Sequence, residues 1–398
     1  MSRGGLGLNH PKYLRLAGRV ERIRPFYVME LLRRARELEA QGRDIVHMEI
    51  GEPDFTTAAP VVEAGVRALR KGYTHYLPAV GLPALREAIA EHYADRYGAR
   101  IDPRRIFITP GASGALLLAM ALVVNPGEEV LVADPGYPCN RNFIELVNGV
   151  PRGLPVSAVD GYQLTAEAVA SAWGERTAAV LIGSPDNPTG VLASAARLQD
   201  LDAEVRRRQG MLIVDEIYHG LHYVADPASA VRHCRQALII NSFSKYYGMT
   251  GWRLGWLVAP CGYEAAVEKL LQNFFINAST PAQYAALACF TVQAREIFEQ
   301  RRTAFRQRRD FLAPALCELG FRLPIVPDGA FYLYADCSAL AADSNDLARL
   351  LLEEAGVAVT PGLDFERTAP HRHLRFAYTT SLPRLQEGVR RIAGYLGR

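Results

Sequence analysis

The chain has 398 residues, enough for two or three domains at about 150 residues each. Its residues are 49% hydrophobic and 22% charged, which are ordinary globular proportions and exclude a disordered chain or a small disulfide scaffold. The formal net charge of +3 is too small over this length to indicate nucleic acid or a membrane surface as a partner.

Neither the cysteines nor the apolar runs indicate a zinc ribbon, a redox pair or a membrane span. The six cysteines are scattered and form no C-x-x-C pair. The longest strongly apolar stretch, Ala115–Val124, is half of the roughly 20 residues that a spanning helix needs. The first residues lack the apolar region of a signal peptide. We therefore expect a cytoplasmic protein with reduced, buried thiols.

Amphipathic helices precede a series of short apolar strands. Apolar residues three and four apart predict helices at residues 28–38 and Leu82–Tyr97. Short runs rich in Val, Ile and Leu then recur at Ile106–Thr109, Val130–Ala133, Ala179–Ile182, Met211–Val214, Leu238–Ile240 and Trp256–Ala259. They lack polar alternation, which is typical of strands buried on both faces of a parallel sheet. Helical segments between them, at Ala112–Val124 and Ala193–Gln209, predict an α/β fold with a mostly parallel, helix-flanked sheet.

The pattern changes near residue 319. A long helical pattern from Pro281 to Cys317 is expected to connect two domains directly. Beyond it we predict a smaller α+β domain, with strands at Phe331–Ala335 and Leu374–Tyr378 and helices near Asn345–Glu354 and Pro383–Tyr395. We therefore divide the chain into an N-terminal segment (1–58) that packs with the small domain, a large domain (59–300) and a small C-terminal domain (301–398).

Polar, aromatic or turn-forming residues follow the predicted strands. The segments that follow five of them are 110–114, 134–138, 184–190, 215–218 and 241–245. Ligands of open α/β sheets bind outside the carboxyl ends of the strands, so these five segments predict one site.

The chemistry of these segments points to one cofactor. Small residues from Gly111 to Gly114 open a helix and allow backbone N–H groups to hold a phosphate. Asp215 ends a buried strand, where a carboxylate needs a cationic partner. Lys245 follows another buried strand, and a desolvated lysine beside a second cation becomes a nucleophile. A phosphate holder, a carboxylate for a protonated ring nitrogen and a nucleophilic lysine together describe a pyridoxal phosphate site.

Longer motifs carry a family resemblance. The segment SFSKYYGMTGWRLG (242–255) resembles the lysine segment of class I/II aminotransferases of fold type I. The resemblance extends to IGEPDF (50–55), the 184–190 turn, DEIY (215–218) and LRF (374–376), in family order over roughly residues 25 to 395.

The resemblance implies an aspartate-aminotransferase-like fold and a role for each matching residue. Lys245 would hold pyridoxal 5'-phosphate as an internal aldimine and shuttle a proton, Asp215 would pair with the pyridine nitrogen, and Tyr218 and Asn187 would bond the phenolic oxygen. Tyr137 would stack on the ring. The phosphate would be held by Gly111, Ala112, Ser113, Ser242, Ser244 and Arg253. Arg375 would clamp the substrate carboxylate, assisted by Gly51 and Asn187.

The resemblance also implies partners. The function would be amino-group transfer from an L-amino acid to a 2-oxo acid by a ping-pong mechanism. Tyr76 matches a tyrosine that reaches the phosphate of a neighbouring subunit, which implies a homodimer with shared active sites. The sequence assigns no second arginine to an acidic side chain. Phe26 and Tyr27 point to apolar or broad acceptance, with glutamate and 2-oxoglutarate as the default returning pair.

Several alternatives stay open. A C–S lyase or decarboxylase on the same fold would use the same cofactor motifs. Gly111–Gly114 followed by Asp134 also fits part of a nicotinamide dehydrogenase, although the full G-x-G-x-x-G fingerprint is absent. A non-enzymatic ligand sensor is a further alternative. His219 and His222 have the spacing of a metal pair, but no third ligand is placed nearby, so we expect structural histidines and no metal site.

Overall fold

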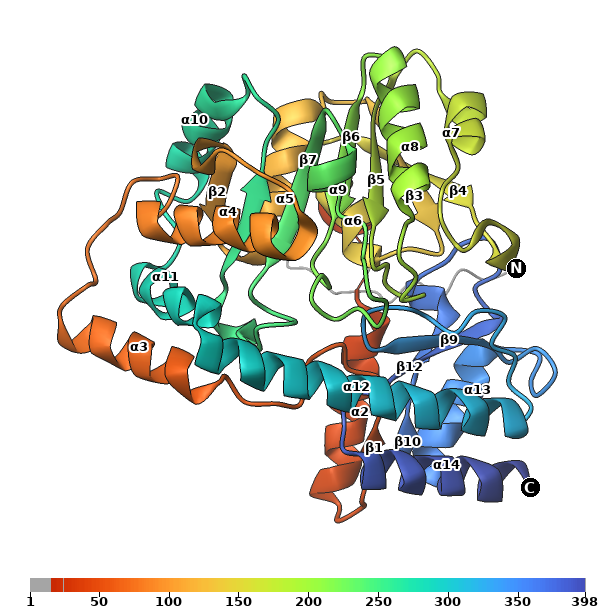
Figure 1. The fold of residues 1–398 in the computed structure, drawn as a ribbon. Helices are drawn as coiled ribbons and strands as arrows, with labels where there is room; N and C mark the ends of the chain where they lie inside the picture. Colours follow the sequence, from red (N-terminus) through yellow and green to blue (C-terminus); the bar gives the residue numbers. More distant parts are fainter. Residues whose placement is uncertain (1–15, 24, 398) are drawn as a thin grey trace.

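A seven-stranded sheet forms the centre of the larger domain (Figure 1). The computed structural model describes residues 16–23 and 25–397. The spatial order is β2-β8-β7-β6-β5-β3-β4. The strands are β2 (Ile106–Thr109), β3 (Glu129–Asp134), β4 (Val150–Pro155), β5 (Thr177–Gly183), β6 (Met211–Asp215), β7 (Ala237–Ser242) and β8 (Gly255–Val258). β8 pairs antiparallel with β2 and β7, and the other neighbours pair in parallel. The predicted α/β class with a mostly parallel sheet is confirmed.

Burial on both faces explains why the strands are continuous apolar runs. All residues of β2, β6, β7 and β8 are buried. Successive side chains of β6 enter opposite cores, with Leu212 and Val214 in one and Ile213 in the other. Each such side chain contributes about 1.5–3 kcal/mol by leaving water. The sequence analysis missed β4, whose segment VPRGLP contains two prolines, because an edge strand tolerates residues that a central strand excludes.

Helices cover both faces of the sheet (Figure 1). Apolar side chains of α5 (Gly111–Val123), α6 (Pro138–Leu146) and α10 (Glu264–Phe274) pack into one core. Those of α4 (Pro83–Tyr97) and α8 (Ala195–Arg207) pack into the other. The remaining helices of the larger domain are α3 (Ala59–Arg70), α7 (Ala166–Ala172), α9 (Ala230–His233) and α11 (Thr280–Ala286).

The long helical pattern from Pro281 to Cys317 is not one helix. It comprises α11, a short 3-10 turn (Leu287–Phe290) and α12 (Val292–Glu318). Thr291 separates the last two with an extended backbone, and its hydroxyl accepts a hydrogen bond from Ala294 N, which caps α12. α12 then runs without interruption across the expected boundary at residues 300 and 301.

The smaller domain contains an antiparallel sheet in the order β11-β12-β9, as the sequence predicted for a separate α+β unit. Its strands are β9 (Tyr332–Asp336), β11 (Thr360–Pro361) and β12 (His373–Ala377), and its helices are α13 (Ser344–Leu350) and α14 (Leu382–Leu396). β1 (Val46–His47) pairs with β10 (Val357–Ala358), and α2 (Tyr27–Ala40) packs beside it. By contrast, α1 (Arg19–Arg22) contacts α6 of the larger domain through the Arg22–Glu145 ion pair.

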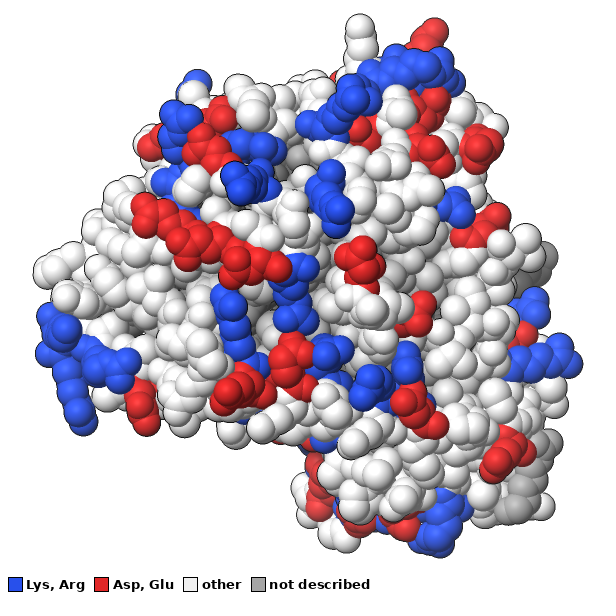
Figure 2. All heavy atoms as spheres, in the orientation of Figure 1, with Lys and Arg blue, Asp and Glu red and all other residues white. Residues whose placement is uncertain are grey.

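Surface features are unexceptional. Among the described residues, no helix is both long enough and apolar enough to cross a bilayer. All six cysteines are free, but Cys261 and Cys317 are exposed, so the expectation that every thiol is buried is wrong. Figure 2 shows positive and negative side chains interleaved over one face of the molecule, in keeping with the small net charge.

Candidate active site

The carboxyl ends of β5, β6 and β7 meet at one cavity of about 440 Å³. Asp215 at the end of β6 pairs with Gly183 of β5 and Ile240 of β7, so the segments that follow these strands are neighbours. Residues from α2, α5 and the small domain close the remaining sides. The five segments predicted from the sequence each contribute at least one residue to this cavity.

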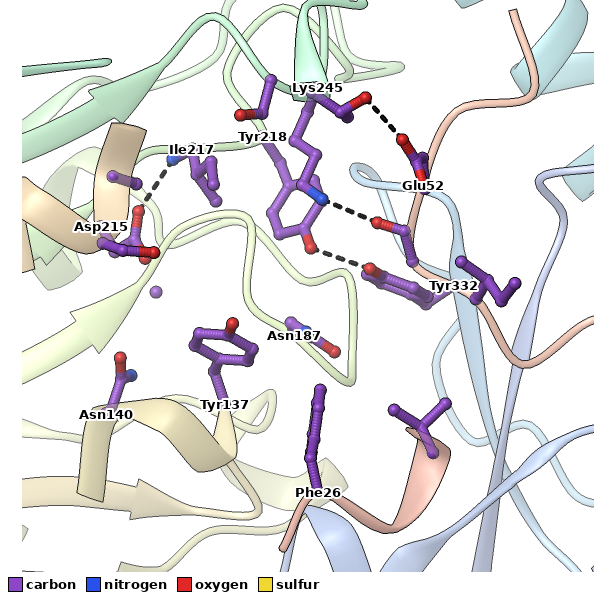
Figure 3. A pocket seen from close by; sticks show the side chains of 18 of the residues that line it. Phe26, Glu52, Tyr137, Asn140, Asn187, Asp215, Ile217, Tyr218, Lys245 and Tyr332 are labelled. Carbon is purple, nitrogen blue, oxygen red and sulfur yellow. Dashed lines mark hydrogen bonds between the residues drawn. The ribbon is translucent and has the colours of Figure 1, made fainter. Parts of the chain in front are cut away.

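Lys245 lies in the turn after β7 and projects into the cavity (Figure 3). Its Nζ donates a hydrogen bond to the Gly51 carbonyl oxygen at 2.7 Å. Burial is the main reason why the pKa of Lys245 is lowered to about 8, and the positive charges of Arg375 and Arg253 lower it further. About a tenth of this amine is therefore neutral and nucleophilic at pH 7, far more than for a lysine with an ordinary pKa.

Asp215 and Tyr218 line the cavity from the segment after β6. The Asp215 carboxylate accepts a hydrogen bond from Ile217 N at 3.0 Å, and burial raises its pKa to about 7. A cationic ring nitrogen beside it would reverse that shift by stabilising the ionised carboxylate. The Tyr218 and Tyr332 hydroxyls are 2.8 Å apart, and burial raises the pKa of Tyr218 well above its usual value.

Hydroxyl, backbone and guanidinium donors form one corner of the cavity. Ala112, Ser113, Ser244 and Arg253 line it directly. Ser242 is placed behind them, where its hydroxyl contacts Ser244 Oγ at 2.9 Å and the Leu254 carbonyl oxygen at 3.1 Å.

Gly111 also lies behind this group of donors, next to Arg253. A Cβ at Gly111 would lie 2.6 Å from Arg253 Nη2, so glycine leaves room for the guanidinium. Gly111 has φ +70°, a backbone conformation that glycine adopts without strain. The corner therefore offers the N-terminal N–H groups of α5 and a fixed cation to a dianionic group.

Hydrogen bonds from both Nη atoms fix the position of Arg375, which lies on β12. Its Nη1 donates to Asn187 Oδ1 at 2.9 Å, and its Nη2 donates to the Glu49 carbonyl oxygen at 2.6 Å. The guanidinium packs against the Tyr332 and Phe365 rings, with its central carbon 4.4 and 4.7 Å from their centroids. Its Nε is buried, and no described residue accepts a hydrogen bond from it. The arrangement suits a carboxylate that approaches from the cavity.

The other predicted residues have different placements. Tyr137 and Asn187 line the cavity, and Figure 3 shows both facing its interior. Gly51 also lines it, and a Cβ there would clash with the Tyr332 hydroxyl. Tyr76 does not line the cavity in this chain, and 79% of its surface is exposed.

Several cavity residues were missed by the sequence analysis. Tyr332, Glu52 and Thr250 line the cavity, and the Thr250 hydroxyl donates to Glu52 at 2.5 Å. Of the two aromatic residues that the sequence analysis named for the substrate side chain, Phe26 lines the cavity and Tyr27 does not. Tyr332 lies in an apolar stretch of sequence that is typical of a buried strand, so no local pattern indicated that its hydroxyl belongs to a site.

Asp134 does not occupy a ligand-binding position. Its carboxylate accepts hydrogen bonds from Arg367 N, Thr368 N and the Thr368 hydroxyl, and it forms an ion pair with Arg141. It therefore joins the two domains, and this carboxylate is not free to bind the ribose of a dinucleotide. His219 and His222 are buried with ring centroids 6.5 Å apart, away from the cavity lining.

Known proteins share both the sequence pattern and the fold. Residues 43–392 match the family model for aminotransferase class I and II. The chain is 35% identical to a valine–pyruvate aminotransferase of Mycobacterium tuberculosis over 94% of this chain and 97% of that protein. It is 36% identical to an aspartate/prephenate aminotransferase of Thermus thermophilus over 96% and 99%.

Solved structures agree with these matches. A crystal structure of an aminotransferase from Mycobacterium tuberculosis superposes with a TM-score of 0.93 at 35% identity, covering 96% of this chain and 99% of that one. The aspartate aminotransferase of Thermus thermophilus with maleate superposes with a TM-score of 0.90 at 35% identity and the same coverage.

Proposed function

The chain belongs to the class I and II aminotransferases, and from that premise we propose how its own residues carry out the transfer. Enzymes of this family depend on pyridoxal 5'-phosphate and move an amino group from an amino acid to a 2-oxo acid in two half-reactions. The matched relatives are named for valine, aspartate and prephenate, so family membership leaves the side chain of the substrate open.

The residues of the cavity fit this cofactor. Arg253, which packs against Gly111, would bind the phosphate together with Ser113 and Ser244. Asp215 is buried and lines the same cavity, where it would pair with a protonated ring nitrogen. Tyr137 would stack on the ring, and Asn187 has its amide nitrogen available because its oxygen accepts from Arg375.

The proposed mechanism assigns one task to each polar group. When bound, the cofactor supplies an electron-accepting ring that stabilises negative charge at the substrate α-carbon. Arg375 holds the substrate α-carboxylate and so orients the α-carbon. Lys245, once its amine is free, removes the proton from that carbon as a general base. Asp215 keeps the ring nitrogen protonated, and Tyr218 orients the phenolic oxygen.

The observation that carries this proposal is the buried Lys245 amine with its lowered pKa between the phosphate corner and Arg375. The test incubates the cofactor-loaded enzyme with single amino acids and follows its visible absorbance together with 2-oxo acid release. We expect absorbance to fall as one equivalent of 2-oxo acid forms, and to return when a second 2-oxo acid is added. Cleavage of the amino acid or loss of CO2 would instead favour the lyase or decarboxylase alternative.

A pH dependence follows from Lys245. Its pKa is lowered from 10.5 to about 8, so half of the amine is neutral at about that pH and nearly all of it about one unit higher. The rate at which added pyridoxal 5'-phosphate becomes attached to cofactor-free enzyme should therefore rise about tenfold per unit below pH 8 and level off above it. Stopped-flow absorbance measures this rate, with N-acetyl-lysine amide as the control. If the rate keeps rising to the same high pH as it does for N-acetyl-lysine amide, the lowered pKa of Lys245 is contradicted.

We also propose a homodimer in which Tyr76 serves the partner's site. α3 packs on α11 with one face and exposes apolar side chains on the other, at Val62, Val66 and Leu69. Tyr76 follows on the same exposed stretch. Contiguous exposed apolar surface of this kind marks interaction sites. Tyr76 does not line the cavity of its own chain.

Mixed dimers test the shared site. One subunit carries Lys245→Ala and the other carries Tyr76→Ala, so a shared site places both defects in one cavity and leaves the other intact. Purified heterodimers should then recover up to half of the wild-type activity per dimer. If their activity only averages that of the two mutant homodimers, Tyr76 serves its own chain and the proposal fails.

The cytoplasm is the proposed location. All six cysteines are free, and two of them are exposed, a state that persists in a reducing compartment. Cell fractionation with detection of the native protein tests this, and recovery from an oxidising compartment would contradict it.

A further inference from the structure

We propose that this enzyme prefers neutral amino acids with bulky apolar side chains, that the first turn of α2 and its N-cap recognise those side chains, and that Asp364 holds this turn in position. The inference rests on the proposed function, because it concerns the substrate of the same cavity.

The charges around the cavity disfavour an acidic side chain. Among the residues that the structure describes, the cationic side chains that line it are Lys245, Arg253 and Arg375. We assign each of these three side chains to the cofactor or the α-carboxylate, so none of them is left to pair with a second substrate carboxylate. The carboxylate of Glu52 lines the same cavity and would repel it. Burying an unpaired charge is costly, so acidic substrates are expected to bind poorly.

An apolar wall lies at the α2 side of the cavity. It consists of Phe26, Val28, Met29 and Leu32. Val28 and Leu32 are four residues apart and therefore lie on one face of the helix. The Phe26 ring meets the Tyr137 ring edge-on with centroids 6.5 Å apart, and Figure 3 shows Phe26 pointing toward Tyr137 and Asn187.

The wall is only partly covered by the protein itself. Met29 is 56% exposed, and Phe26 and Leu32 are half-buried. An apolar substrate side chain would cover these surfaces and gain affinity in proportion to the area removed from water. A methyl group as small as that of alanine would reach little of the wall.

Asp364 fixes the wall through the backbone. Its two carboxylate oxygens accept hydrogen bonds from Tyr27 N and Val28 N, both at 2.9 Å, so it caps the start of α2. Phe26 occupies the N-cap position, and its side chain makes no cap hydrogen bond. Asp364, from a loop distant in the sequence, therefore caps α2 in place of a side chain at the N-cap position. Its negative charge also interacts favourably with the positive end of the helix dipole.

The loop that carries Asp364 is itself anchored. Gly136 N donates to the Phe365 carbonyl oxygen at 3.0 Å, and Asp134 accepts from the backbone of residues 367 and 368. Asp364 thus links the α2 wall to the segment that carries Tyr137. We assign it as a positioning residue, because it acts through Phe26 and the rest of the wall.

The first test measures kcat/KM of the holoenzyme for phenylalanine, leucine, alanine and aspartate. Phenylalanine and leucine should exceed aspartate by at least about tenfold, which is typical discrimination in an apolar pocket. Phe26→Ala should lower the values for phenylalanine and leucine at least about tenfold and that for alanine less than about threefold. Val159→Ala is the control, because Val159 is 95% exposed and does not line the cavity.

The outcomes separate the two proposals. If no amino acid yields a 2-oxo acid, the proposed function fails. If transamination occurs but aspartate is preferred, or if Phe26→Ala lowers alanine and phenylalanine equally, the specificity inference alone is overturned.

The second test addresses Asp364. Asp364→Ala should raise KM for phenylalanine about tenfold while kcat for alanine stays within about threefold, and Asp364→Asn, which retains one acceptor oxygen, should be intermediate. The Phe26→Ala/Asp364→Ala double variant should be scarcely worse than Phe26→Ala, because both changes remove the same recognition. Fully additive losses, or equal losses for alanine and phenylalanine, would show a merely structural role and overturn this assignment.

Discussion

Lys245→Ala is expected to lower kcat by about 10⁴-fold or more with every amino acid. The variant loses both the amine that attaches the cofactor and the base that acts on the α-carbon, and general acid–base catalysis alone accounts for about 10²–10⁴-fold. Borohydride treatment followed by peptide mapping should label wild-type enzyme at Lys245 and leave the variant unlabelled.

The chain offers a clean control for this experiment. Its lysines are Lys12, Lys71, Lys245 and Lys269, so a label has few places to go. Lys269 lies exposed on α10 outside the cavity, and Lys269→Ala should keep both activity and labelling. A label on any other lysine of the wild-type protein, or substantial turnover by Lys245→Ala, would refute the assignment of Lys245.

Arg375→Lys is expected to lower kcat/KM by about 10- to 150-fold for all α-amino acids alike. Hydrogen bonds between charged groups contribute about 1.5–3 kcal/mol, and an ammonium group cannot reproduce the planar fork. The structure sharpens this expectation, because Asn187 and the Glu49 carbonyl oxygen each engage one arm of the guanidinium while two rings hold its plane.

The measurement compares alanine, phenylalanine and glutamate with wild type and variant. Arg306→Lys is a matched control, because Arg306 is exposed on α12 and does not line the cavity. A loss confined to glutamate would mean that Arg375 reads the substrate side chain, and it would contradict the proposed carboxylate clamp.

Local signals were sufficient for six of the seven strands of the large sheet, all except the edge strand β4, and for the residues that follow them. Unbroken runs of Val, Ile and Leu are stable where both faces are buried, so Met211–Val214 and Leu238–Ile240 could be recognised without neighbours. Parallel strands bring their carboxyl ends together, so Asp215 and Lys245 were expected at one site before any distance was known. The role of Arg375 was predicted from the resemblance of its motif to the family, because nothing in the neighbouring sequence indicates what a single arginine in a strand binds.

The tertiary structure decided what surrounds that site. Asp364 accepts from Tyr27 N across 337 residues of sequence, and Tyr218 meets Tyr332 across 114, and no periodicity encodes such contacts. The break at Thr291 was missed because apolar spacing continues through α11 and α12 while one extended residue separates them. The sequence by itself determined the buried strands of the large sheet and which polar residues follow them, including Asp215 and Lys245, since these depend on short-range burial and turn formation. The wall of α2, its cap and the hydrogen bonds that hold Arg375 depended on the packing of the two domains, because each is formed by groups that only the folded chain brings together.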